Sequence, residues 1–461
     1  MTYPEFNPRT ASADEIMQWA RPLEGQPIGR MTASKWADRV CDASAKGAVG
    51  GLYEKYFGIV ANSEQEPDFP GAGIELKSVP ILMNPGPNRV KERTMLSMID
   101  YMKVVDEQWA NASVRKKLDH IFFIFYGYER GATIGSLRTL KVHLWSPTAE
   151  IMPFLEDDWL VVRGKVEGGL AHTISEADGR ILGAATKSAD SSKRRRQPRS
   201  VISAKPRAWA LKPAFTWTIY LEAVGKFGGV SVIQQLKLQR RPLLFEQRIL
   251  DKLTPLVGRA LGEIEGELRI NHSEAKNAVA SALRRMLALP PRGTITEFER
   301  FGIEVKMAPL RPDAMPYEAM SFPAFEHLAL QDEDWEDSDL LRRLQRVLFL
   351  PVLRRTRGAP VKERWLGRPF FWTPGPGDLV GIREEWEHIR QMIRDRRAKE
   401  LPHESETRFI HVRPKGRDAN DRDMIPGGGT VTKKCLWLNK RYVQRIVLES
   451  GTDWSGTMEK R

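Results

Sequence analysis

The chain has 461 residues, of which 41% are hydrophobic and 28% are charged, so it is long enough for two or three globular domains. Lys and Arg number 72 against 59 Asp and Glu, and the net charge of +13 favours a polyanionic partner, nucleic acid ahead of membrane. The two cysteines, Cys41 and Cys435, argue against a disulfide framework or a zinc site, and no phosphate-loop motif supports ATP-driven translocation.

The polar first residues and the lack of a long apolar run predict no signal peptide and no membrane span, hence a reducing, cytoplasmic protein. The spacing of apolar residues predicts the elements in chain order. Helices are expected over 13–21, 32–57, 94–105 and around 156–159, and strands over 74–81, 121–126 and near 181–182. The basic run Lys193–Arg196 with Arg199 lies in a Ser/Pro-rich segment, where it is either a solvated loop or a contact for phosphates.

The segment 68–81, DFPGAGIELKSVPI, holds two carboxylates and one amine at close spacing. Side chains alternate faces along a strand, so Glu75 and Lys77 point the same way. The turn-prone residues 70–73 can bring Asp68 back toward Glu75. Two converging carboxylates suit Mg²⁺, and a neighbouring lysine can orient a water molecule for cleavage of a phosphodiester. The alternative for the motif alone is an edge strand with solvated charges.

The second half of the chain repeats the first at offsets between 226 and 230 residues. The paired segments include GIELKSVPI from Gly73 with GIEVKMAPL from Gly302, Trp145-Ser-Pro with Trp372-Thr-Pro, and Asp157-Asp-Trp with Glu384-Glu-Trp. Ordered matches at one long offset indicate a duplicated domain. We predict domains over 1–225 and 251–461, joined by a linker over 226–250.

The two copies differ where chemistry would be done. Glu297, Glu304 and Lys306 stand where the first copy has Asp68, Glu75 and Lys77, and Arg284 and Arg343 stand where it has Glu54 and Lys117. A guanidinium beside a metal-binding site repels the metal ion and neutralises the charge of the neighbouring carboxylate, here Glu304. The first copy is therefore expected to be catalytic and the second to bind DNA without cutting it.

The segments KGAVGGLYEKYFG, DFPGAGIELKSVPI and SVRKKL resemble the MutH family of mismatch-repair endonucleases, and RFIHVRPKGRDAN and KKCLWLNKRYV in the second half are similar to it too. The resemblance covers nearly the whole chain. It implies an α/β fold of two tandem restriction-endonuclease-like domains, each a central mixed β-sheet flanked by helices. The duplication resembles type II restriction endonucleases with two MutH-type domains, in which the first copy cuts at GATC and the second binds another site as an allosteric effector.

Carried over residue by residue, the resemblance implies a metal site at Asp68, Glu75 and Leu76, a catalytic lysine at Lys77, and Glu54 and Lys117 completing the active site. The DNA contacts that it implies are Lys46, Gly47, Arg115, Lys116, Lys187, Arg207 and Trp209 in the first half and Arg413, Lys415 and Trp437 in the second. Lys187 matches the lysine of an Arg-Pro-Lys element, although Ala185 and Thr186 replace the Arg-Pro. A lysine is suited to guanine acceptors.

These features lead to the expectation of a Mg²⁺-dependent endonuclease, with Mn²⁺ as a substitute, that acts on double-stranded DNA. The products implied by the resemblance are a 5′-phosphate and a 3′-hydroxyl, and dimerisation or DNA looping is expected when two sites are bound. Two alternatives stay open. A nicking enzyme of mismatch repair is disfavoured by the duplication, and a non-cutting DNA-binding protein is disfavoured by the residues Asp68, Glu75 and Lys77.

Overall fold

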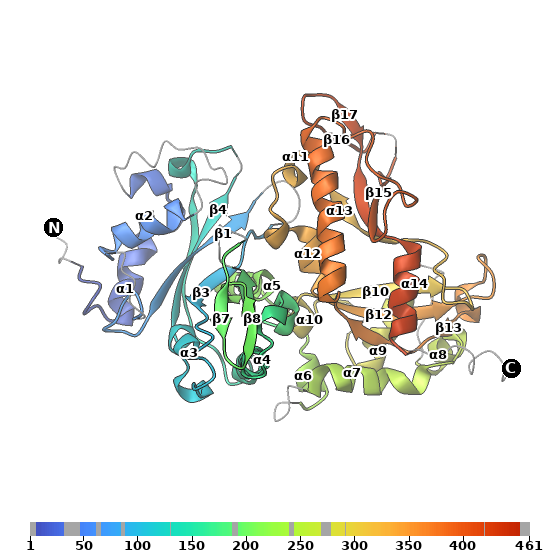
Figure 1. Cartoon of the computed structure of the whole chain (residues 1–461), viewed down its shortest axis with the longest axis horizontal. Helices are drawn as coiled ribbons and strands as arrows, with labels where there is room; N and C mark the ends of the chain where they lie inside the picture. The colour runs from blue at the N-terminus through green and yellow to red at the C-terminus, as the bar shows by residue number, and fades with distance from the viewer. Residues whose placement is uncertain are drawn as a thin grey trace. The chain divides into compact units, whose positions relative to one another are not determined.

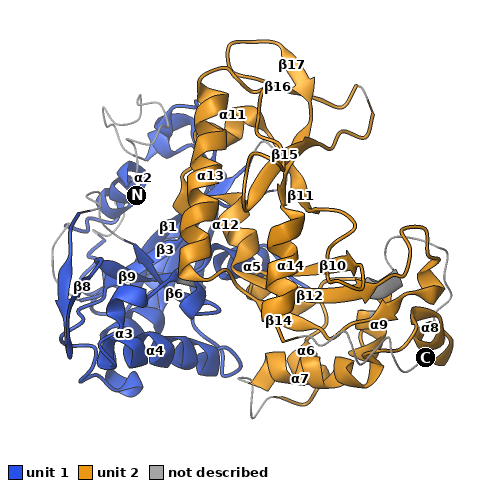
Figure 2. Ribbon diagram, turned by 45° about the vertical axis from the view of Figure 1, so that its right-hand side comes forward, with its two compact units in different colours: residues 1–228 blue, residues 229–461 orange. Residues whose placement is uncertain are grey.

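The structure, a computed structural model, describes residues 6–31, 47–60, 66–83, 88–129, 131–186, 192–238, 244–268, 278–290, 292–418 and 420–451. The chain divides into two compact units, unit 1 over Met1–Gly228 and unit 2 over Gly229–Arg461 (Figures 1 and 2). Lys46 and Lys187 lie outside the described residues. No helix in the described part of the chain is long and apolar enough to cross a membrane.

The main sheet of unit 1 is mixed, as the resemblance implied. Its strands are β1 (Glu75–Leu82), β2 (Arg89–Val90), β4 (Ile121–Tyr128) and β5 (Thr139–Trp145), in the order β2-β1-β4-β5. The central pair, β1 and β4, is parallel, with Glu75 opposite Ile121, whereas β2 and β5 pair antiparallel to their neighbours. Because β4 is buried on both faces, its sequence is a continuous apolar run instead of an alternating one.

Helices cover both faces of this sheet. They include α1 (Ala13–Ala20), α2 (Ala48–Tyr56) and α5 (Pro213–Ala223). On one face, Phe122 of β4 packs with Phe57 at the end of α2, with ring centroids 5.8 Å apart. On the other face, Phe125 packs against Tyr220 of α5, at 5.1 Å. The alternation of β4 side chains therefore fixes α2 and α5 on opposite sides of β1 and β4.

A smaller sheet of unit 1 has the order β3-β9-β6. Its strands are β3 (Thr94–Met98), β6 (Leu182–Thr186) and β9 (Arg207–Leu211), and the hairpin β7 (Arg195–Gln197) with β8 (Ser200–Ala204), α3 (Ser113–Leu118) and α4 (Met152–Glu167) complete the unit. The helix predicted over 94–105 is wrong: residues 94–98 form β3, which pairs antiparallel with β9 and buries Thr94 and Leu96, and residues 101–105 form turns.

Unit 2 repeats this plan. Its main sheet has β10 (Ile303–Leu310), β12 (Arg346–Leu353), β13 (Trp365–Leu366) and β14 (Phe370–Trp372), and its smaller sheet has β11 (Met320–Phe325), β18 (Lys434–Leu438) and β15 (Ile410–Pro414). The parallel pair β10 and β12 matches β1 and β4. From residue 261 on, the α-helices of its described part are α8 (Leu261–Glu267), α9 (Ala278–Met286), α10 (Thr296–Arg300), α11 (His327–Leu330), α12 (Asp339–Leu344), α13 (Pro376–Arg394) and α14 (Lys440–Glu449), and a hairpin pairs β16 (Arg422–Met424) with β17 (Thr430–Thr432).

Much of the segment 226–250, which the sequence suggested as a linker, is helical. It contains α6 (Val232–Gln235) and the start of α7 (Phe245–Leu253). The buried carboxylate of Glu297 accepts hydrogen bonds from Ser231 Oγ at 2.5 Å and from the Val232 N–H at 2.8 Å. These bonds attach α6 to α10, so residues 231–235 pack against the body of unit 2.

Candidate active site

The turn before β1 brings Asp68 to the edge of the strand. Phe69 and Ile74 exchange backbone hydrogen bonds of 2.9 and 3.2 Å, and Gly73 has a φ of 65°, which suits glycine because it has no Cβ. The N–H of Leu76 then donates to Asp68 Oδ2 over 2.8 Å. The turn residues therefore place the first carboxylate beside β1, as the sequence predicted.

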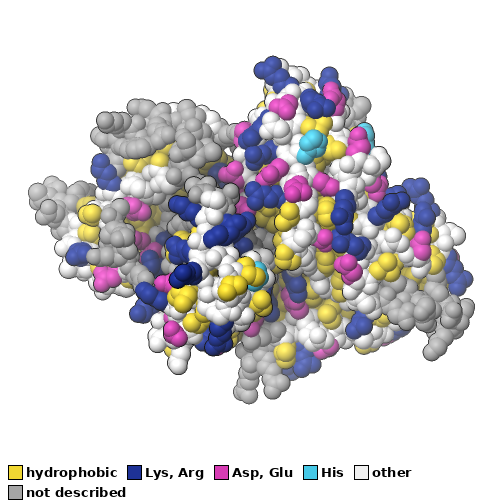
Figure 3. Space-filling view, viewed as in Figure 1, with side chains coloured by type: hydrophobic (Ala, Val, Ile, Leu, Met, Phe, Trp, Pro, Cys, Tyr) yellow, Lys and Arg dark blue, Asp and Glu magenta, His cyan; other side chains and the backbone are white. Residues whose placement is uncertain are grey.

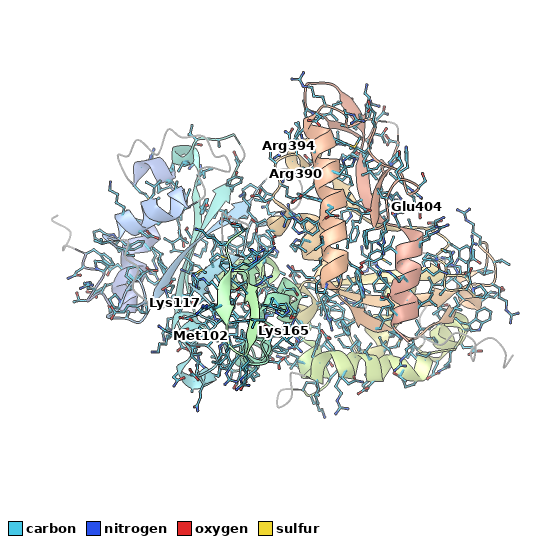
Figure 4. The ribbon with its side chains drawn as sticks, viewed as in Figure 1. Met102, Lys117, Lys165, Arg390, Arg394 and Glu404 are labelled. Atoms are coloured by element: carbon cyan, nitrogen blue, oxygen red, sulfur yellow. The ribbon has the colours of Figure 1, made fainter. Side chains whose placement is uncertain are left out.

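Glu75 lies at the centre of the candidate site. Its side chain is 3% exposed, and its Oε1 lies 2.6 Å from Lys77 Nζ and 3.0 Å from Lys117 Nζ. Lys117 comes from α3, which ends just before β4 (Lys117 is labelled in Figure 4). Because β1 and β4 run parallel with Glu75 opposite Ile121, the end of α3 lies beside the start of β1.

The two carboxylates influence each other electrostatically. The pKa of Asp68 is raised, first by burial and then by the negative charge of Glu75, while Lys77, the Leu76 N–H and Lys117 act in the opposite direction. Two carboxylates held close enough to repel are the ligands that a hard divalent cation favours. Asp68 and Glu75 therefore fit a metal site.

The backbone of Leu76 adds a further oxygen. The Glu75 N–H donates over 3.0 Å to the carbonyl of His120, the residue before β4. The backbone N–H of the next residue, Leu76, therefore points to the opposite edge of β1, where it donates to Asp68. The carbonyl of a strand residue points to the same edge as its N–H. The Leu76 side chain is 6% exposed, so the carbonyl is the group of Leu76 that fits a metal. Among the described residues, no group of three or more His, Cys, Asp or Glu side chains is arranged to hold a metal ion.

Helix α2 carries Glu54 and begins after Gly47. Gly47 caps the helix with a φ of 89°, and a Cβ added at Gly50 would lie 3.3 Å from Ser78 Oγ of β1. Residues four apart share a helix face, so Glu54 lies on the same side as Gly50. Its half-buried side chain makes no hydrogen bond to Asp68 or Glu75, both of which are described. The catalytic role of Glu54 stays a prediction.

The matching place in unit 2 is filled by a guanidinium. Arg343 hydrogen-bonds the carboxylate of Glu304, and its Nε lies 2.6 Å from Asp339. Lys306 Nζ donates to Ser321 O over 3.2 Å and lies 3.8 Å from Glu304. Glu297, the counterpart of Asp68, is turned to α6 instead. Glu304 thus keeps two cationic neighbours at the places of Lys77 and Lys117, whereas Glu297 is bound away from it.

Sequence reasoning missed Asp339 as the second partner of Arg343. The two residues are four apart on α12, the spacing at which helical side chains pair, so the pattern could have revealed it. Arg284, which stands in the place of Glu54, donates from Nε to Pro290 O over 2.7 Å.

The expected DNA contacts of unit 1 lie in different surroundings. Arg115 pairs with Asp119 at 2.6 Å, Lys116 is exposed, and Arg207 Nη1 donates to Ala184 O over 2.7 Å. Trp209 is 1% exposed on β9, the central strand of the smaller sheet, so its ring lies in the core of unit 1, and its contact with DNA stays a prediction. Trp437 of unit 2, which corresponds to Ala210 in the repeat, is half-buried.

Around Trp437 the expected contacts do come together. Arg413 and Lys415 lie over its ring, with 5.6 and 5.8 Å from the charged group to the centroid. Arg413 also pairs with Glu404 at 2.5 Å (Glu404 is labelled in Figure 4), and Lys415 Nζ donates to Ser321 Oγ over 2.8 Å. An aromatic ring flanked by two cations is suited to nucleic acid.

Comparisons with known proteins agree with a duplicated fold. The model of the family described as DNA mismatch repair enzyme MutH matches residues 57–158 and 293–385, one segment in each unit. The type II restriction enzyme Sau3AI of Staphylococcus aureus is 26% identical over 431 residues, which cover 86% of this chain and 87% of that enzyme. The mismatch repair protein MutH of Yersinia pseudotuberculosis is 32% identical over 183 residues, which cover 38% of this chain and 77% of that protein.

A second MutH protein, from Serratia proteamaculans, is 30% identical over 216 residues, covering 45% of this chain and 92% of that protein. The fold and these relatives together define a site-specific deoxyribonuclease with two restriction-endonuclease-like domains. The chain belongs to the MutH family, and its two-unit length makes it a MutH-like type II restriction endonuclease.

Proposed function

We propose that the protein makes Mg²⁺-dependent double-strand cuts at GATC, with unit 1 cutting and unit 2 binding a second site as an allosteric effector. The observation that carries the division of labour is the difference between the two sites. In unit 1, the Asp68 carboxylate lies beside β1 and close to Glu75, which pairs with Lys77 and Lys117. In unit 2, Glu297 binds Ser231 and Val232 instead, and Arg343 takes the place of Lys117 on Glu304. The GATC sequence and the effector role rest on the resemblance to two-domain relatives.

In this proposal the oxygens of Asp68 and Glu75 and the Leu76 carbonyl hold the metal ion. When bound, a divalent cation lowers the pKa of a coordinated water and neutralises charge on the phosphate. Glu75 is buried, and Lys77 and Lys117 both donate hydrogen bonds to its carboxylate. These bonds hold the carboxylate in one orientation. Such preorganisation is what makes a charged site effective.

The lysines have a second task in the proposed reaction. Lys77 Nζ, 2.6 Å from Glu75 Oε1, would hold the attacking water beside the scissile phosphate. Lys117 would add positive charge where negative charge develops on the phosphate oxygens. Glu54, on α2, is proposed to complete the active site. The exposed Lys116 is proposed to bind the DNA backbone, and such a phosphate contact positions the DNA without reading its sequence.

One experiment separates the proposed function from its alternatives. Full-length protein is incubated with Mg²⁺ and a supercoiled plasmid that carries several GATC sites. Linear fragments with ends mapping to GATC are expected; nicked circles would support a nicking enzyme, and shifted bands without cutting would support a binding protein. A protein carrying both Asp68→Ala and Glu75→Ala that still cuts would overturn the assignment of the site.

The effector role has its own test. A plasmid with one GATC site is expected to be cut slowly, with rescue by a GATC oligonucleotide added in trans. The variant Lys415→Ala, which removes a cation over Trp437, is expected to weaken that rescue. Equal wild-type rates on one-site and many-site plasmids would contradict an effector function for unit 2.

A further inference from the structure

The hairpin β7–β8 of unit 1 presents a strongly cationic surface. Its exposed basic residues are Lys193, Arg194, Arg195, Arg196 and Arg199. The segment 192–204 contains no Asp or Glu. Figure 1 shows the two strands as a narrow ribbon in green, and on the face in Figure 3 dark blue side chains gather over it. The hairpin therefore concentrates positive charge without an acidic residue in its own sequence.

Apolar side chains stand beside these charges. Val201 is 101% exposed and Ile202 is 52% exposed, both on β8. One exposed valine would need no explanation. Adjacent side chains of a strand point to opposite faces, so each face of the hairpin carries one exposed β-branched side chain near the arginines of the paired strand. Cationic and apolar side chains together suit contact with phosphates and base edges.

The hairpin is fixed to the body of unit 1. Gln197 is 5% exposed, and its Oε1 accepts the Ala171 N–H over 2.6 Å while its Nε2 donates to Ile202 O over 2.5 Å. At the base of the hairpin, Tyr101 donates its hydroxyl to Lys205 O over 2.6 Å. An anchored arm loses less conformational entropy on binding than a flexible loop does.

The corresponding hairpin of unit 2, β16–β17, has balanced charges. The segment 417–433 has three basic and three acidic residues. Arg422 donates to Thr430, Asp421 pairs with Lys433 at 2.9 Å, and Asp423 binds His327 at 2.6 Å. These contacts serve the fold of unit 2. The cationic surface is thus a property of the first copy.

We propose that the hairpin β7–β8 is a DNA-contacting arm of unit 1, in which Arg195 and Arg196 bind backbone phosphates and Val201 and Ile202 enter a groove. The proposal rests on the proposed function and adds a surface to it. A two-stranded ribbon fits the major groove, where apolar side chains contact thymine methyl groups. The phosphate contacts fix the position of the duplex relative to the active site, and the tip contributes an affinity that salt does not screen.

The test measures binding of full-length protein to a short GATC duplex in EDTA at several salt concentrations. Arg195→Gln with Arg196→Gln is expected to weaken binding and to lower the slope of log affinity against log salt by about 0.9 for each lost phosphate contact. Val201→Ser with Ile202→Ser is expected to weaken binding several-fold at an unchanged slope. Plasmid cleavage at limiting enzyme should slow for both.

The matched control is Arg21→Gln with Arg30→Gln, which removes the same charge from exposed positions near α1. Its slope and affinity should equal those of the wild type. The proposal would be overturned if both hairpin variants bound DNA with wild-type affinity and salt slope. It would also be overturned if the hairpin variants lost binding to phosphatidylserine vesicles while their DNA binding was unchanged. A wild-type protein that neither binds nor cuts DNA would instead overturn the proposed function.

Discussion

The carboxylate of Asp158 joins α4 to the start of β6. It is 1% exposed and accepts the backbone N–H groups of Arg180, Ile181 and Leu182 over 2.8, 2.8 and 2.9 Å. Burial raises its pKa from 3.8 to about 6 despite these hydrogen bonds. In the sequence this residue was noticed only as part of a repeated motif, because nothing in the pattern reveals which backbone groups a carboxylate will reach.

We expect Asp158→Asn to lower the stability of unit 1 by about 1–3 kcal/mol, since an amide has one acceptor oxygen for three N–H donors. The raised pKa means that the folded state holds the proton more tightly than the unfolded state. The stabilisation from that proton is therefore complete below 3.8 and is lost as pH rises through about 6. The difference in urea midpoint between wild type and variant should be larger at about pH 4 than at about pH 7; a difference that grows with pH would contradict the assignment.

At the scale of elements, unit 2 repeats this junction, in which a helix carboxylate accepts backbone N–H groups at the start of a strand. Glu385 on α13 accepts the N–H groups of Arg408, Phe409 and Ile410 at the start of β15, and the adjacent Trp386, like Trp159 in unit 1, is buried. The repeated motif in the sequence thus corresponds to a repeated junction between a helix and a strand. Its function is to satisfy strand donors that have no strand partner.

Glu385→Ala is expected to leave these three donors without their acceptor. Amide hydrogen exchange of Phe409 and Ile410 should speed up by at least about tenfold, which corresponds to roughly 1.4 kcal/mol of local opening. The control is Glu387→Ala on the same helix, which removes only an exposed pair with Arg383. Equal exchange in both variants would show that the Glu385 carboxylate does not hold β15.

Elements were predicted well where burial produces a regular pattern. The strands β1 and β4 and the helices α1 and α4 were found because each buries a regular face or a continuous run. The start of β3 was misread because residues 94–105 alternate too weakly for a strand, and only pairing with β9 settles it. The basic run at 193–199 was expected to be a loop, but it forms part of the hairpin β7–β8. The sequence did not reveal this because the hairpin is held by contacts such as that of Gln197 with Ala171, which is distant in the chain.

For the whole molecule, the proposed division of labour is tested by making the same substitution at Glu75 in unit 1 and at the corresponding Glu304 in unit 2. Glu75→Gln should reduce plasmid cleavage by at least ~100-fold, because the amide is a poor ligand for a hard cation and no longer pairs with Lys77 and Lys117. Duplex binding in EDTA should persist, since the basic surfaces are unchanged. Cleavage is scored on a plasmid with several GATC sites.

Glu304→Gln is the matched change in unit 2, where the side chain is bound to Arg343. We expect this variant to keep the cleavage chemistry on the same plasmid. A loss of cleavage as large as that of Glu75→Gln would show that both units carry active sites, and the proposed division of labour would fail.

The sequence by itself determined the family, the duplication and the position of Asp68, Glu75 and Lys77, because these depend on the order of residues and on side-chain alternation within one strand. Only the tertiary structure decided that Lys117 reaches Glu75, that Trp209 is buried, and that Glu297 turns to α6. Each of these depends on contacts between segments far apart in the chain, and local spacing carries no information about them.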